Sequence, residues 1–186
     1  MNITLPTSIT LFRIALIPVF VVCFYLPYPW ANQAAALVFL LASMTDWVDG
    51  FLARAMNQES AFGAFLDPVA DKLMVAVAIV LLVAVNPTPL VAIPSLVIIS
   101  REITVSALRE WMAELGSRAT IKVSFVGKAK TTAQLFSLLL MIYNEPIYGL
   151  PTFSIGLIFF YIAAVLTLYS MLIYLKAAWP VMSKHS

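Results

Sequence analysis

Four aspartates lie in one short stretch of the chain, and their spacing makes them the residues best suited to chemistry. Asp46, Asp49, Asp67 and Asp71 are the only aspartates among the 186 residues, and they follow the pattern D-x2-D-G-x2-A-R-x8-G-x3-D-x3-D. Unneutralised carboxylates at one place repel one another, so such a group needs cations. Oxygen ligands suit hard divalent ions such as Mg2+, Mn2+ or Ca2+, and two such ions about 3.5–4 Å apart stabilise phosphoryl transfer.

Helical geometry predicts how these carboxylates meet. At about 100° and 1.5 Å per residue, the pattern forms two successive helical faces. The first face carries Asp46, Asp49, Gly50 and Ala53, and the second carries Gly63, Asp67 and Asp71. Two helices that face each other would bring all four carboxylates to one place.

The eight specified positions of this pattern are all present, and together they resemble the signature of the CDP-alcohol phosphotransferases, membrane enzymes of phospholipid synthesis. The resemblance implies transfer of a phosphatidyl group from a CDP-linked lipid to an alcohol, with release of CMP. It also implies that Asp46, Asp49 and Asp67, with Asp71 contributing, hold Mg2+ or Mn2+ in a two-metal site. Asp71 would be the general base that takes the proton of the attacking hydroxyl.

The small residues and the cation of the signature are candidates for binding nucleotide and diphosphate. Gly50, Ala53 and Gly63 would let a nucleotide approach the backbone, or would simply let helices pack closely. Arg54 would contact diphosphate or cytidine, or would be an ordinary cytoplasmic anchor. Thr45 would orient a ligand, or would bond back to its own helix.

A second group of candidates is cationic and consists of Arg101, Arg109, Lys128 and Lys130. Arg101 and Arg109 are rotated by about 80° on a helix, so they can face one side. Arg101 lies in an apolar segment and needs a partner. Glu102 is expected to point elsewhere, so a substrate phosphate would satisfy Arg101 through two parallel bonds. The alternatives are the usual cytoplasmic excess of Lys and Arg and, for Arg109, surface pairs with Glu110 or Glu114.

The longer stretches TDWVDGFLAR, FGAFLDPVADK, REITVSALREWMAEL and GKAKTTAQ resemble the bacterial members of this family that make phosphatidylglycerophosphate from CDP-diacylglycerol and glycerol 3-phosphate. This resemblance runs from about Leu5 to Leu175. It implies an N-terminal element near the site, with Thr10 and Arg13, and a homodimer formed through membrane helices. Many relatives have asparagine at the position of Thr7, so no role for Thr7 follows. Inositol phosphate and serine stay open as alternative acceptors.

The composition predicts an all-α integral membrane protein with a single domain over residues 1–186. Hydrophobic residues make up 62% of the chain and charged residues 11%, with a mean hydropathy of +0.98. These values exclude an ordinary soluble globule, and a net charge of +2 is too small to indicate nucleic acid. Six membrane helices are predicted, at about 8–26, 32–56, 61–85, 90–115, 123–143 and 151–179.

The distribution of Lys and Arg predicts the orientation in the membrane. The connections near 27–33, 86–89 and 144–150 contain neither residue, whereas the eleven cations lie in the termini, the other connections and the adjoining helix ends. The positive-inside rule therefore places both termini and the aspartates on the cytoplasmic side. With the family resemblance, this indicates the bacterial inner membrane, where the site would reach lipid and cytosol together.

Some alternatives and boundaries stay open. Intramembrane acids also occur in cation transporters, and an aspartate-rich prenyltransferase also binds diphosphate through Mg2+. The single cysteine, Cys23, and the single histidine, His185, exclude a disulfide framework and make a Ser-His-Asp hydrolase a poor interpretation. Pro68 indicates either that the third helix begins near Gly63 or that it bends at the site.

Overall fold

The structure is a computed structural model that describes the backbone of residues 5–56, 61–114 and 125–185. Side chains are described over residues 7–45, 62–63, 65–114, 129–176 and 178–179. The described backbone forms six helices: α1 (Leu5–Tyr25), α2 (Ala31–Met56), α3 (Ala61–Val85), α4 (Pro89–Glu114), α5 (Phe125–Tyr143) and α6 (Thr152–His185). This confirms the predicted all-α fold and the number of helices.

Four of the helices are long and apolar enough to cross a membrane, counting only the residues that the structure describes. These segments are Thr7–Tyr25, Phe65–Val85, Pro89–Glu114 and Thr152–Lys176, and α2 adds a shorter apolar segment, Ala31–Thr45. Large apolar side chains such as Val80, Leu96 and Val165 are exposed on the outside of the bundle. A surface of this kind suits lipid, so the chain is a membrane protein. That α2 and α5 also cross the bilayer remains a prediction.

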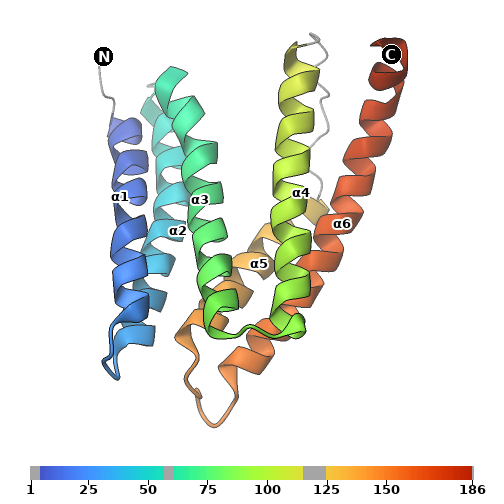
Figure 1. The fold of residues 1–186 in the computed structure, drawn as a ribbon. Helices are drawn as coiled ribbons and strands as arrows, with labels where there is room; N and C mark the ends of the chain where they lie inside the picture. The colour runs from blue at the N-terminus through green and yellow to red at the C-terminus, as the bar shows by residue number, and fades with distance from the viewer. Residues whose placement is uncertain (1–4, 57–60, 115–124, 186) are drawn as a thin grey trace.

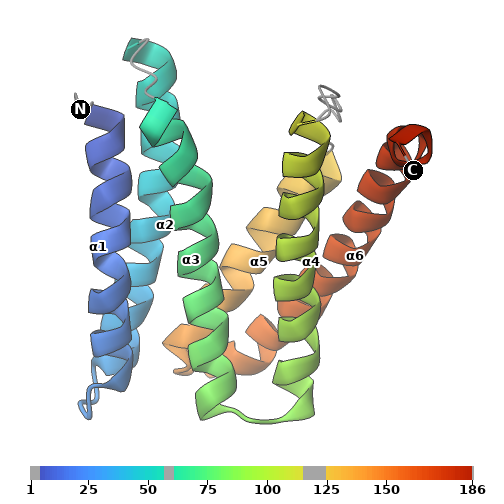
Figure 2. The same cartoon turned by 45° about the horizontal axis from the view of Figure 1, so that its top comes forward.

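The bundle has two halves (Figure 1), one made by α1, α2 and α3 and the other by α4, α5 and α6. Helix α1 packs against α2 and α3, whereas α6 packs against α4 and α5. The halves meet where α5 packs against α2 and α3, and where α4 packs against α3. Figures 1 and 2 show both termini at the same end of the bundle, as expected for an even number of crossings.

Small residues allow the helices to approach closely. Ala35 and Ala42 of α2 and Ala78 of α3 are fully buried, and Phe20 and Phe39 fill the space between α1 and α2 with ring centroids 5.9 Å apart. Close packing of this kind drives helix association in lipid, where the hydrophobic effect between helices is absent.

Prolines and short connections set several helix ends. Helix α3 ends at Val85 and α4 begins at Pro89, and a proline is well tolerated in the first turn of a helix. Helix α3 begins at Ala61 and continues through Pro68, so the proline lies inside the helix and removes one of its hydrogen bonds.

Candidate active site

Asp67 and Asp71, the two aspartates with described side chains, lie one turn apart on α3 and both interact with α1. The Oγ1 atom of Thr10 donates a hydrogen bond to Oδ1 of Asp67 at 2.5 Å. The guanidinium group of Arg13 forms an ion pair with Oδ1 of Asp71. The N-terminal element that the resemblance implied is therefore in direct contact with the acidic residues of α3.

A buried polar row on α1 makes these contacts possible. Thr7, Thr10 and Arg13 follow one another at intervals of three residues and are all buried. Spacing of this kind places them along one face of the helix. Buried polar groups are costly unless they are paired, and the carboxylates of α3 provide partners on this face. Thr7 belongs to this row, although the sequence assigned it no role.

Arg13 also connects the two helices that carry the signature. Its Nε atom donates to Oγ1 of Thr45 on α2 at 3.4 Å, while Thr45 itself donates to the carbonyl oxygen of Ala42 at 2.7 Å. Thr45 immediately precedes Asp46, so Arg13 links the start of the acidic stretch of α2 to Asp71 of α3. The bond of Thr45 back to its own helix is thus present, and a role in orienting a ligand stays a prediction.

Several predicted site residues have side chains outside the described ranges. These are Asp46, Asp49, Gly50, Ala53 and Arg54, whose backbone lies in α2, and Lys128, whose backbone lies in α5. Gly63 is described and is buried near the start of α3. Among the described side chains, no three His, Cys, Asp or Glu residues come together in a way that could hold a metal ion. The four-carboxylate site therefore stays a prediction.

The described part of the acidic site has the chemistry that a hard divalent ion requires. Asp67 and Asp71 offer carboxylate oxygens one turn apart on the same helix, and the Asp71 side chain is 44% exposed. Oxygen ligands accessible from outside the bundle suit Mg2+ or Mn2+. The residues present thus fit the implied metal in ligand type and in spacing along α3.

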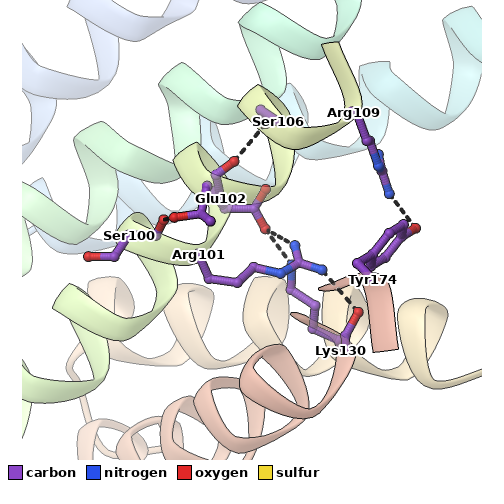
Figure 3. A network of polar contacts seen from close by, with 9 residues as sticks. Ser100, Arg101, Glu102, Ser106, Arg109, Lys130 and Tyr174 are labelled. Carbon is purple, nitrogen blue, oxygen red and sulfur yellow. Dashed lines mark hydrogen bonds and ion pairs between the residues drawn. The ribbon is translucent and has the colours of Figure 1, made fainter. Parts of the chain in front are cut away.

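A second polar cluster joins α4, α5 and α6 (Figure 3). The Nη1 atom of Arg101 lies 2.8 Å from Oε1 of Glu102, and the ammonium group of Lys130 forms an ion pair with the same oxygen. The Nη2 atom of Arg101 donates to Oγ of Ser170 at 3.0 Å. The cluster therefore places two of the four predicted cations around one carboxylate.

The expectation that Glu102 points away from Arg101 was wrong. Although these residues are adjacent on α4, both side chains are long enough to curl toward each other. A cation buried in apolar surroundings is strongly destabilised unless an anion compensates it, which favours the nearest carboxylate.

Arg109 lies near this cluster but has a different partner. Its Nη2 atom donates to the hydroxyl of Tyr174 on α6, and its guanidinium carbon lies 4.7 Å from the centre of the Tyr174 ring. The sequence predicted that Arg109 binds the acceptor phosphate, with surface pairs to Glu110 or Glu114 as the alternative. Ser170 and Tyr174 were missed, and the only sequence signal for them is that they stand one turn apart on a largely apolar helix.

An apolar hollow of about 430 Å³ lies between α2 and α5. Its walls include Phe39 and Met44 of α2 and Phe136 and Leu139 of α5. Met44 directly precedes Thr45, and Thr132 on the opposite wall is two residues beyond Lys130. The hollow therefore lies along the facing apolar parts of the two helices.

Comparison with known proteins identifies the class of enzyme to which this membrane-embedded helical bundle belongs. The family model of the CDP-alcohol phosphatidyltransferases matches residues 3–169. The chain belongs to this family and is an enzyme, and use of divalent metal ions is a property of the family.

Two similar proteins come from enteric bacteria. The chain is 53% identical over 178 residues to the CDP-diacylglycerol–glycerol-3-phosphate 3-phosphatidyltransferases of Salmonella typhimurium strain LT2 and of Escherichia coli strain K12. Each alignment covers 96% of this chain and 96% of the relative.

Proposed function

We propose that the protein transfers the phosphatidyl group of CDP-diacylglycerol to glycerol 3-phosphate, giving phosphatidylglycerophosphate and CMP. The observation that carries this proposal is the buried cationic pair Arg101 and Lys130, which belongs to α4 and α5, whereas Asp67 and Asp71 belong to α3. A phosphate-bearing acceptor would need such a pair, whereas serine would need it less. The names of the relatives support the same reaction.

The acidic side would hold the activated lipid. Asp46, Asp49 and Asp67, with Asp71, would hold Mg2+ or Mn2+ in a two-metal site, and a bound ion there would neutralise the charge of the diphosphate. Nucleotide and diphosphate would also contact the remaining signature positions, Gly50, Ala53, Arg54 and Gly63. In support, Asp67 and Asp71 present oxygen ligands one turn apart, and Thr10 orients Asp67.

Asp71 would act as the general base. It would accept the proton from the hydroxyl of glycerol 3-phosphate as that oxygen forms its bond to the lipid-linked phosphorus and the bond to CMP breaks. The ion pair with Arg13 would fix the orientation of the carboxylate. The 44% exposure of the Asp71 side chain supports this role, because a proton acceptor must be reachable by the substrate.

The phosphate of the acceptor would bind the cationic cluster. Arg101 and Lys130 would contact it directly, with Arg109 and Lys128 adding positive charge at the rim. Arginine suits this task because its planar group binds phosphate through two parallel hydrogen bonds.

The hollow between α2 and α5 would take part of the lipid. Its apolar walls suit an acyl chain, and one wall includes Met44, two residues before Asp46 of the signature. A hydrocarbon chain placed there would stay in apolar surroundings while the headgroup reached the aspartates.

The single domain would be a multi-pass protein of the bacterial inner membrane, with termini and active site on the cytoplasmic side. Both termini lie at one end of the bundle, and the connections at the other end lack Lys and Arg, which supports this orientation. A homodimer formed through membrane helices is part of the same proposal.

An acceptor panel tests the proposal. Purified protein in detergent micelles would receive CDP-diacylglycerol with glycerol 3-phosphate, inositol phosphate, serine or no acceptor, each with Mg2+, Mn2+ or chelator, and CMP release would be measured. We expect CMP release with glycerol 3-phosphate and metal only. Preference for inositol phosphate or serine would identify a sister enzyme, and ion flux into liposomes without lipid turnover would indicate a transporter.

A further inference from the structure

We infer that Glu102 is a positioning residue that brings Arg101 and Lys130 together as one phosphate-binding pair. The inference rests on the proposed function, because it concerns how the acceptor site is assembled. Neither the aspartate signature nor the set of predicted cations includes Glu102. Its role follows from the contacts in Figure 3, where both cationic side chains converge on its carboxylate.

In the described part of the chain, the two cations belong to helices that are not in direct contact with each other. Over the residues that the structure describes, α4 packs against α3 and α6 but not directly against α5. Arg101 belongs to α4 and Lys130 to α5, and α6 packs against both of these helices, so the two cations meet through their side chains and not through a contact between their own helices. The ion pair between Glu102 and Lys130 spans this gap.

Electrostatic repulsion between the two cations also favours an anion between them. The side chains of Arg101 and Lys130 are only 8% and 7% exposed, and like charges this poorly solvated repel each other strongly. Both cations donate a hydrogen bond to one oxygen atom of Glu102, Oε1, and these two attractive contacts offset the repulsion between the cations. The three groups retain one net positive charge, so the cluster still attracts a phosphate dianion.

Unused donors remain for that phosphate. The Nε atom of Arg101 is buried and has no hydrogen-bond partner among the described residues. The ammonium group of Lys130 has three N–H donors, and Glu102 occupies one of them. Glu102 is the most exposed of the three side chains, at 27%, so it lies on the open side of the cluster. Its carboxylate therefore lies nearer the surface than the two cations that it joins.

A double-mutant cycle tests the inference. Glu102→Gln keeps the size of the side chain but removes its charge, so the two cations should separate. Loss of a charge-assisted bond of this kind corresponds to roughly a tenfold increase in KM for glycerol 3-phosphate. The KM for CDP-diacylglycerol should stay unchanged, which also shows that the variant is folded. Glu102→Asp should recover part of the lost affinity, because it restores the charge at a shorter reach.

Lys130→Ala completes the cycle. If Glu102 acts by placing Lys130, Glu102→Gln should have much less effect in the Lys130→Ala background than in the wild type. Glu110→Gln is the matched control, since Glu110 is exposed on the same helix and outside the cluster. It should leave both KM values unchanged.

The outcomes separate this inference from the proposed function. If Lys130→Ala raises the KM for glycerol 3-phosphate but Glu102→Gln does not, the role of Glu102 is refuted and the acceptor site stands. Fully additive effects, or an effect of Glu102→Gln on the lipid substrate instead, also refute it. If Lys130→Ala leaves the KM for glycerol 3-phosphate unchanged in an active enzyme, the assignment of the acceptor site itself fails.

Discussion

Arg13 on α1 forms an ion pair with Asp71 on α3 across a separation of 58 residues, and this contact joins the buried polar row of α1 to the acidic signature. The same guanidinium group reaches Thr45 of α2. One buried cation thus contacts both helices that carry the aspartates. The position of Asp71 therefore depends on α1, a helix that contributes no acidic residue.

Asp71→Asn is predicted to abolish turnover while largely preserving binding of CDP-diacylglycerol. The amide cannot accept the proton of the attacking hydroxyl, and loss of a general base costs about a hundredfold or more in kcat. CMP release measures turnover, and protection from thermal unfolding by CDP-diacylglycerol measures binding. Glu114→Gln, the same type of change at an exposed site of α4, serves as the control. Substantial residual turnover in Asp71→Asn would assign the base to another residue.

Arg13→Met is predicted to destabilise the fold more than Arg13→Lys. Methionine fills the space but leaves Asp71 without its cation, whereas lysine keeps the charge and loses the contact with Thr45. Since Asp71 is partly exposed, water compensates part of the loss, and we expect a cost of about 1–3 kcal/mol for Arg13→Met. Thermal unfolding in detergent measures the difference, with Phe12→Leu on the exposed face of α1 as a control. Equal stability of both Arg13 variants and the wild type would show that the ion pair contributes little.

Metal removal is predicted to stop the reaction reversibly. A chelator should abolish CMP release, and Mg2+ or Mn2+ should restore it, because hard divalent ions need the oxygen ligands that the aspartates offer. Asp67→Asn should raise the metal concentration needed for half-maximal activity, since it replaces a charged ligand by a neutral one. Activity that persists after exhaustive chelation, in wild type or variant, would remove the metal from the proposed site.

The sequence predicted what local chemistry determines and missed what packing determines. The prolines around Asn86 predicted the break between α3 and α4, and long apolar runs predicted the helices. The direction of Glu102 could not be predicted, because the conformation of a long side chain depends on the charges around it in the folded protein. The contact between Arg109 and Tyr174 depends on how α6 is rotated and shifted against α4, which no single segment encodes.

Gly156→Ala is predicted to destabilise the packing of α5 on α6. A methyl group at this position would lie 2.8 Å from Cγ of Met141 and 2.9 Å from the backbone oxygen of Ser137. The methionine can adjust, but the backbone oxygen is fixed in α5, so the helices would have to separate. We expect a loss of about 1–3 kcal/mol, typical of overpacking. Thermal unfolding in detergent would be compared with that of Ser154→Ala, a small change at an exposed position of α6. An unchanged midpoint for Gly156→Ala would mean that α5 and α6 tolerate a wider spacing at this position.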